Sequence, residues 1–140
     1  MIVAARERTE TLAAGSAEAL EALDVGAWRR EVGDLLLRVS ELVRGDTRGP
    51  DHRNADLVGA DLRRRRLRNA GLRGAYLIGA DLRGLDLGTA DVLGADLRAA
   101  DLRGTDLSDC LFLTQPQVAA AVGDAATRIP AVLTRPAHWC

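Results

Sequence analysis

The chain has 140 residues, a formal net charge of −1, and basic side chains that are all arginine. This balance of charge gives no electrostatic drive toward nucleic acid or an anionic membrane. Aromatic residues make up only 3% of the sequence. A conventional globular core would therefore be poorly supplied, and we expect an interior filled with Leu and Ala.

The sequence also bears on the compartment. No stretch approaches the roughly 18 apolar residues that span a bilayer, and the start, MIVAARERTE, lacks the apolar segment of a signal peptide. The two cysteines, Cys110 and Cys140, have no motif spacing, so we expect free thiols in a reducing compartment. The sequence predicts a cytoplasmic protein.

The N-terminal segment, residues 1–45, is predicted to be helical. Residues 1–15 are polar and Ala-rich, and we expect partial disorder there. Ser16 is a suitable N-cap for a short helix, and Asp24 can cap a second, stronger helix.

The stronger helix, predicted over residues 27–44, has its apolar residues at steps of three and four along one face. They are Trp28, Val32, Leu35, Leu36, Val39, Leu42 and Val43. Two interpretations remain open: an element that caps or flanks the rest of the fold, or a helix that binds a partner or forms a homodimer.

Residues 46–54 are rich in Gly, Pro and Asp and are predicted to be a connector. The connector contains His52, and the only other histidine is His138. Neither has Cys, His or Asp neighbours at the spacing of metal ligands, so we expect no metal site.

Residues 55–114 form twelve consecutive five-residue units: ADLVG, ADLRR, RRLRN, AGLRG, AYLIG, ADLRG, LDLGT, ADVLG, ADLRA, ADLRG, TDLSD and CLFLT. A large apolar residue occupies the centre of every unit. Ala stands two positions before the centre in eight units, and Asp stands one position before it in eight units. Self-similarity at a fixed period predicts a repeat architecture.

The period of five predicts a square coil. Two inward positions, the centre and the residue two before it, require a short extended piece followed by a tight turn. The last position of most units is Gly or Asn, residues that tolerate the positive φ of some turns. Four corners close a coil of 20 residues, and twelve units give about three coils. The Asp before the centre points outward and can accept backbone N–H bonds near the corner.

These A-D-L-x-x units resemble the pentapeptide repeat family, which forms a right-handed quadrilateral β-helix. The resemblance covers residues 55–114. The stretch from Leu113 to Trp139 is similar to a tail often found after such repeats. We therefore expect a β solenoid of about three coils, flanked by N-terminal α-helices and by residues 115–140 as a capping segment with one short helix.

Residues twenty apart should share a face of the solenoid. One face then carries a grid of alternating charge, which is either a solvated ion-pair network or a recognition surface. The grid consists of Asp61, Asp81, Asp101, Arg63, Arg83 and Arg103.

An apolar corner is predicted beside this grid. Its members are Val58, Ile78, Leu93 and Leu113, joined by Tyr76 and Leu111. A contiguous apolar patch is normally covered or used for binding. We expect the helix over 27–44 or the C-terminal segment to cover it. If neither does, it is the candidate protein-binding surface.

One inner column departs from Ala at Arg65, Leu85 and Thr105. A buried, unpaired guanidinium is costly, so we expect the head of Arg65 to reach solvent or an acidic partner, or the coil to be distorted locally. The run over residues 63–68 is densely basic. It is either a solvated edge or a contact for a polyanion.

The end of the repeats should be closed by larger side chains. Phe112 replaces the last central Leu and is predicted to plug the lumen. Thr114 is predicted to cap a helix over 115–122 that stops at Gly123. Trp139 is expected to anchor the tail by packing.

No catalytic motif is present, and the carboxylates lie on a convex surface, so we expect neither an enzyme nor a cofactor. The first interpretation is a protein–protein interaction or scaffold module with an unidentified partner. The resemblance implies an alternative, since some pentapeptide repeat proteins mimic duplex DNA, bind type II topoisomerases and protect against gyrase poisons. Residues 55–114 hold nine Asp and nine Arg. This neutrality and the short length disfavour DNA gyrase as the partner, and we expect no direct contact with nucleic acid or membrane.

Overall fold

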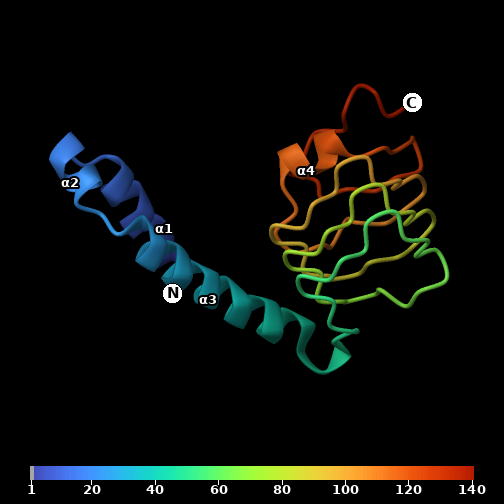
Figure 1. Cartoon of the computed structure of the whole chain (residues 1–140), viewed down its shortest axis with the longest axis horizontal. Coiled ribbons are helices and arrows are strands. Elements are labelled where there is room, and N and C mark those ends of the chain that lie inside the picture. Colours follow the sequence, from blue (N-terminus) through green and yellow to red (C-terminus); the bar gives the residue numbers. More distant parts are fainter. Residues whose placement is uncertain (1) are drawn as a thin grey trace. The chain divides into compact units, whose positions relative to one another are not determined.

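The computed structural model describes residues 2–140. The chain divides into two compact units, Met1–Val43 and Arg44–Cys140, which are described separately (Figure 1).

The first unit is helical. It contains α1 (Ile2–Ala13), α2 (Ala17–Glu21) and most of α3 (Val25–Arg44). Both predicted caps are confirmed: Ser16 Oγ accepts from the Ala19 N–H at 3.2 Å, and Asp24 Oδ1 accepts from the Ala27 N–H at 2.8 Å. The expected disorder over residues 1–15 is wrong for most of that segment, because α1 forms there.

The second unit is a β solenoid, as predicted. Isolated parallel bridges join residues twenty positions apart, so four units make one coil; one face pairs Asp51, Gly71, Asp91 and Leu111 in succession. Successive coils are joined by backbone bonds such as the Leu57 N–H to the Tyr76 carbonyl at 2.9 Å. Each side of the coil is too short to form a strand longer than a single bridge. The coils are stacked in Figure 1.

Pairing extends beyond residues 55–114 on both sides. After the short 3₁₀ helix η1 (Gly45–Thr47), the Gly49 N–H donates to the Asn69 carbonyl at 2.9 Å. At the other end, Val122 and Arg128 bridge to Asp101 and Asp106. Part of the predicted connector therefore belongs to the first coil, and part of the tail continues the solenoid.

The corners are tight turns. The Ala60 N–H donates to the Leu57 carbonyl at 3.2 Å, and the intervening Gly59 has a φ of +65°, the left-handed conformation that glycine adopts without strain. Asp side chains also accept the N–H two residues on, as from Val58 to Asp56 and from Arg63 to Asp61, both at 3.2 Å. The predicted role of Asp at the corners is confirmed.

The lumen is filled with leucine and alanine. Central residues such as Leu72 and Leu77, and the Ala residues two positions before a centre such as Ala75 and Ala80, are 0% exposed. This filling needs almost no aromatic side chains, which explains the composition of the sequence.

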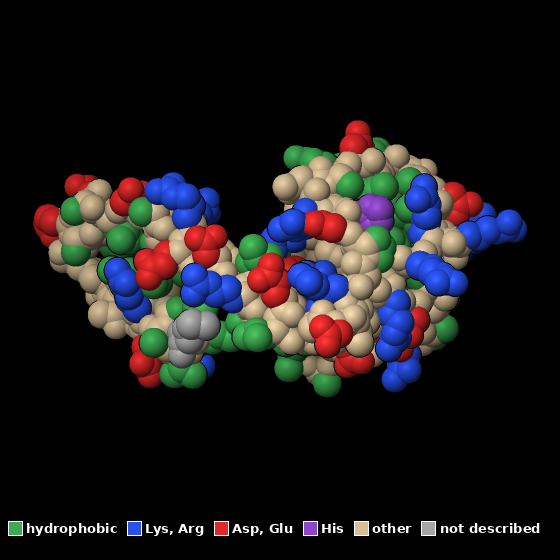
Figure 2. All heavy atoms as spheres, turned by 90° about the horizontal axis from the view of Figure 1, so that it is seen from below, with side chains coloured by type: hydrophobic (Ala, Val, Ile, Leu, Met, Phe, Trp, Pro, Cys, Tyr) green, Lys and Arg blue, Asp and Glu red, His purple; other side chains and the backbone are tan. Residues whose placement is uncertain are grey.

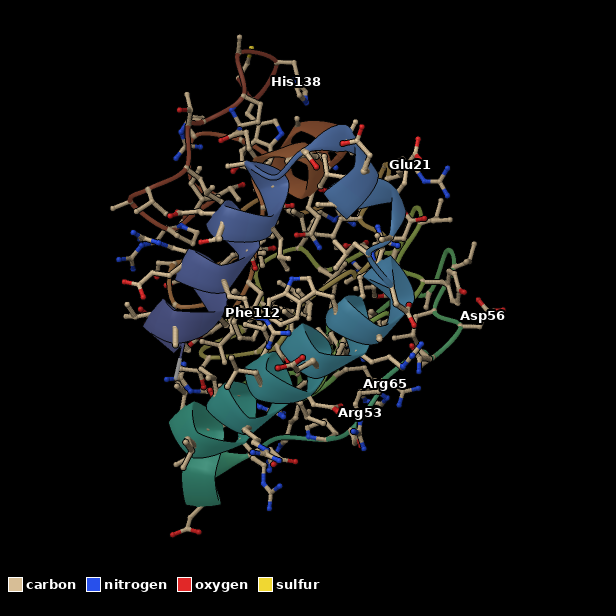
Figure 3. All side chains as sticks on the ribbon, turned by 90° about the vertical axis from the view of Figure 1, so that its left-hand side faces the viewer. Glu21, Arg53, Asp56, Arg65, Phe112 and His138 are labelled. Atoms are coloured by element: carbon tan, nitrogen blue, oxygen red, sulfur yellow. The ribbon has the colours of Figure 1, made fainter. Side chains whose placement is uncertain are left out.

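The first coil is distorted at Arg65, as predicted. The Arg65 side chain is exposed (Figure 3), and among residues 2–140 no bridge joins Arg66 to Asp86, although the other three faces are bridged at this level. Two coils further on in the same column, Thr105 is buried and donates its hydroxyl to the Leu82 carbonyl at 2.8 Å.

The C-terminal segment begins with α4 (Gln115–Ala120), two residues shorter than predicted. The Gln117 side chain accepts from the Thr114 N–H at 2.9 Å, and its amide donates to the carbonyls of Val92 and Ala95 at 2.8 and 3.0 Å. One side chain thus caps α4 and holds it against the coil below.

Trp139 closes the top of the lumen, which confirms the predicted packing anchor. Val122 pairs with Asp101 of the coil below. Gly123 therefore takes the position that Leu102, which fills the lumen, takes in that coil. A Cβ on Gly123 would lie 2.4 Å from the Trp139 ring, so the indole occupies the space that a central side chain takes elsewhere. The ring is 4% exposed, and its N–H donates to the Ala121 carbonyl at 3.0 Å.

Phe112 is not the plug that the sequence predicts. Its φ is +64°, its side chain is only half-buried, and the Arg73 guanidinium lies 5.9 Å from the ring centroid. The neighbouring Leu113, expected on the outer surface, is 9% exposed and belongs to the core. Because Phe112 has a left-handed backbone conformation, the residue that faces the core just before α4 is Leu113, one position later than the repeat predicts.

Candidate interaction surfaces

The predicted charge grid is a continuous ion-pair ladder. Each arginine pairs with the aspartate of its own unit, and the first two also lie near the aspartate one coil on. The N–O distances are 2.7 Å for Arg63–Asp61, 3.3 Å for Arg63–Asp81, 2.7 Å for Arg83–Asp81, 3.6 Å for Arg83–Asp101 and 2.6 Å for Arg103–Asp101. Acidic and basic side chains are also interspersed over the part of the repeat unit visible in Figure 2.

The ladder is electrostatically self-satisfied. Hydrogen bonds from the arginine two residues on hold the pKa values of Asp61, Asp81 and Asp101 below the ordinary range. The same bonds raise the pKa values of the arginines. Because the charges of both signs are paired along the face, it presents no large net charge to a ligand.

One ion pair that the sequence analysis missed is buried. Asp91 is 1% exposed, and its Oδ2 accepts from Arg73 Nη2 at 2.9 Å and Nε at 3.1 Å. The sequence contains a sign of this pair. The unit of Arg73 has Gly71 where most units have Asp, so this arginine pairs with the aspartate one coil on. The pair is a structural link between two coils.

The predicted apolar corner is divided by the structure. Val58 is 55% exposed, Tyr76 is 53% exposed and Ile78 is half-buried. Leu93 and Leu111 are half-buried, and Leu113 is in the core. We call Val58, Tyr76 and Ile78 the apolar face. They lie on adjacent coils, since the Gly59 N–H donates to the Ile78 carbonyl at 2.8 Å and Tyr76 bridges to Asp56.

A groove of about 410 Å³ continues this side of the solenoid. One wall is the segment over 94–98, and the other is α4 with Thr114, Pro116 and Gln117. The two features are contiguous, because Tyr76 bridges to Asp96 in the groove wall. The Asp96–Arg98 ion pair, at 2.6 Å, supplies a charged rim.

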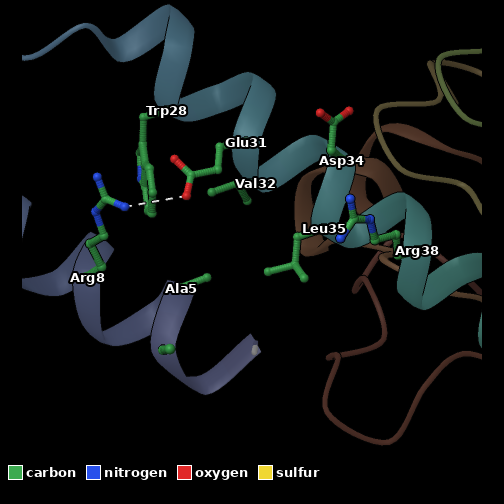
Figure 4. Close-up of a pocket in the computed structure, with 9 residues that line it drawn as sticks. Ala5, Arg8, Trp28, Glu31, Val32, Asp34, Leu35 and Arg38 are labelled. Carbon is green, nitrogen blue, oxygen red and sulfur yellow. Dashed lines mark hydrogen bonds and ion pairs between the residues drawn. The ribbon is translucent and has the colours of Figure 1, made fainter.

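A second groove, of about 400 Å³, lies within the helical unit between α1 and α3 (Figure 4). Arg8 crosses it: the guanidinium lies 4.5 Å from the Trp28 ring centroid and pairs with Glu31 at 3.4 Å. Val32 and Leu35 form its apolar floor. The sequence analysis did not predict this groove.

The remaining chemistry is sparse. Among residues 2–140, no group of three or more His, Cys, Asp or Glu side chains is arranged to hold a metal ion. Within the same range, no helix has the length and apolar character needed to cross a membrane. Both thiols are free, and burial raises the pKa of Cys110 to about 12. In the basic run, Arg63 and Arg68 form ion pairs, Arg68 with Asp86.

The stacked coils, each built of four five-residue units, define a β solenoid, and the repeats match a known family. Residues 55–92 and 75–112 match the model of pentapeptide repeats, in eight copies. Residues 55–112 therefore carry pentapeptide repeats of the kind that this model describes.

The chain is also similar to two known proteins. The chain is 60% identical over 138 residues to "Uncharacterized protein YybG" of Bacillus subtilis (strain 168), covering 95% of this chain and 50% of that protein. The chain thus spans about half the length of the curated relative it matches. A crystal structure of a pentapeptide repeat protein from the Arabidopsis thaliana thylakoid lumen is 28% identical with a TM-score of 0.46, over 69% of this chain and 63% of that one.

Proposed function

We propose that this protein is a non-catalytic interaction or scaffold module, and that a partner protein docks on the apolar face and the adjoining groove. The observation that carries the proposal is the exposure of Val58 and Tyr76, each above one half, on neighbouring coils. In finer detail, we propose that residues 55–114 form the right-handed quadrilateral β-helix of about three coils that the family resemblance implies.

The two sides of the solenoid differ in what they offer a partner. The ladder side has its charges paired within the molecule. On the apolar face, a tyrosine and two aliphatic side chains stand beside a groove with a charged rim. An apolar centre with a polar rim is the usual anatomy of a protein interface, and tyrosine is enriched among residues that dominate binding.

A comparison of matched variants tests this proposal. Wild-type protein and the Val58→Glu/Tyr76→Glu variant are used in parallel as baits to capture proteins from a cell lysate. The Arg103→Gln variant is a control on the ladder side. We expect a reproducible bound protein with the wild type and the control, and at least a tenfold loss with the double variant. Equal capture by all three baits contradicts the proposed face. A native melting curve for each variant checks that the coils are intact.

The DNA-mimicking alternative is tested separately with a gyrase supercoiling assay. Mimicry of DNA requires a dense negative surface, whereas the aspartates of the ladder are all paired with arginine. We therefore expect neither inhibition of supercoiling nor protection from a gyrase poison at micromolar protein. Inhibition that survives the Val58→Glu/Tyr76→Glu changes supports the alternative and contradicts the module proposed here.

A further inference from the structure

The apolar residues of α3 follow a heptad. Val25, Trp28, Val32, Leu35, Val39 and Leu42 are separated by alternating steps of three and four. We call these six residues the α3 seam. A seam with this 3.5-residue period is typical of helices that pair in a coiled coil, and a helix of 20 residues is about 30 Å long.

The residue types at the two seam positions indicate the kind of pairing. The first position is β-branched each time, with Val25, Val32 and Val39. The second is Trp28 and then Leu35 and Leu42. β-branched residues at the first core position with leucine at the second favour two parallel strands.

The helical unit does not bury this seam by itself. Among residues 2–43 no apolar side chain is buried. At the ends of the seam, Val25 is 51% exposed and Leu42 is 77% exposed, and the flanking Val43 is 50% exposed. A unit of this size buries little surface, and chains only slightly smaller, below about 40 residues, usually need disulfides, metals or oligomerisation.

An open groove lies between α1 and the middle of the seam. Arg8 approaches Trp28 and Glu31, and the groove lined by Val32 and Leu35 stays open beside them. α1 therefore faces Trp28 and Leu35 across the groove (Figure 4), and Val25 and Leu42, at the ends of the seam, are not part of the groove lining.

The parallel register brings no like charges together beside the seam. Consider the residue just before each first core position of one helix. In a parallel pair it lies opposite the residue five positions further along in the other helix. Asp24 then faces Arg29 of the second copy, and Glu31 and Arg38 face the uncharged Leu36 and Val43. No flanking pair brings like charges together.

We propose that α3 pairs with α3 of a second copy of this chain, in parallel, through the α3 seam. The repeat unit begins where α3 ends, at Arg44, so the dimer carries two repeat units from the same end of the helix pair. Two linked copies of one surface raise avidity without a new contact. This inference is independent of the proposed docking face.

The mass in solution tests dimer formation. Light scattering on the full chain is expected to give twice the 14.9 kDa of the monomer, and Leu42→Glu is expected to give the monomer mass. Val58→Glu, a similarly exposed site in the repeat unit, is the matched control and should remain dimeric. A monomeric wild type, or a dimer that Val58→Glu dissociates and Leu42→Glu does not, overturns the proposal. Because Leu42 is largely exposed, the variant should retain its helical circular dichroism signal.

A cysteine scan tests the parallel direction. Leu42→Cys in a Cys140→Ser background places equivalent thiols against each other in a parallel pair. Under mild oxidation it should form a covalent dimer on a non-reducing gel. Glu41→Cys in the same background lies off the seam and should remain uncrosslinked. A dimeric Leu42→Cys protein that does not crosslink, or crosslinking to the same extent by both variants, overturns the parallel register.

Discussion

Single residues carry unequal weight in this protein because only two positions of each unit face the lumen. At the C-terminal end that rule changes: Gly123 supplies no side chain, and Trp139 fills the space from sixteen residues further along the chain. The indole is held by its bond to the Ala121 carbonyl. The smallest and one of the largest side chains therefore form one packing unit.

Gly123→Ala tests this unit. The added methyl would lie 2.4 Å from the indole, and overpacking of this kind costs about 1–3 kcal/mol. Urea unfolding should show a loss of that size. In a Trp139→Ala background the same change should cost much less, because the obstructing ring is gone. Equal costs in both backgrounds would show that Trp139 is not the cause.

At the scale of elements, the ion-pair ladder links successive coils along one face. Each aspartate of the ladder has two roles: Oδ1 accepts the backbone N–H two residues on, and the carboxylate pairs with arginine. The same geometry sets the turn and the charge pattern. The ladder is therefore part of the corner and not an addition to the surface.

The ladder predicts how stability depends on pH. The pKa values of Asp81 and Asp101 lie below the ordinary 3.8 in the folded protein, chiefly through hydrogen bonds from Arg83 and Arg103. A lowered folded pKa gives stability that is complete above the unfolded pKa and is lost as the pH falls through the folded one. The urea midpoint should be flat down to about pH 4 and then fall.

A variant isolates the contribution of the ladder. Arg83→Gln removes the donor to Asp81, so the midpoint should fall less steeply below about pH 4. Arg66→Gln, which removes an exposed arginine outside the ladder, is the control and should keep the wild-type slope. Identical slopes for wild type and Arg83→Gln would contradict a role of the ladder in acid stability.

At the scale of the whole molecule, the two units differ in how they are stabilised. The core cluster draws its members from residues between Leu57 and Trp139, and all of them lie in the second unit. Apolar burial of this kind is the main source of folding stability. Residues 44–140 should thus fold without the helical unit.

A deletion of residues 2–43 tests this independence. In urea, the remaining chain should unfold in one cooperative transition whose midpoint is close to that of the repeat unit in the full chain. The unfolding is monitored by far-UV circular dichroism and tryptophan fluorescence. Trp139 is the only tryptophan left, so it reports on the closed end of the lumen. A deletion variant that is unfolded or aggregated contradicts an independent repeat unit.

The sequence by itself determined the solenoid, its lumen of leucine and alanine, the corners, the aspartate bonds and the partners in the charge ladder. Each of these follows from local geometry repeated every five residues, so one unit predicts the next. The distortion at Arg65 was predictable for the same reason, because a break in a regular column is visible without a structure.

Only the tertiary structure decided what happens where the period ends. The outward position of Phe112, the burial of Leu113 and the pairing of Trp139 with Gly123 depend on contacts between segments that share no repeat. The continuation of the coils to Arg128 depends on backbone pairing that the side-chain pattern does not encode there, whereas Asp51 and Asn54 keep the register of the repeats. A periodic sequence specifies its own neighbours, whereas a capping segment is specified by the surface on which it packs.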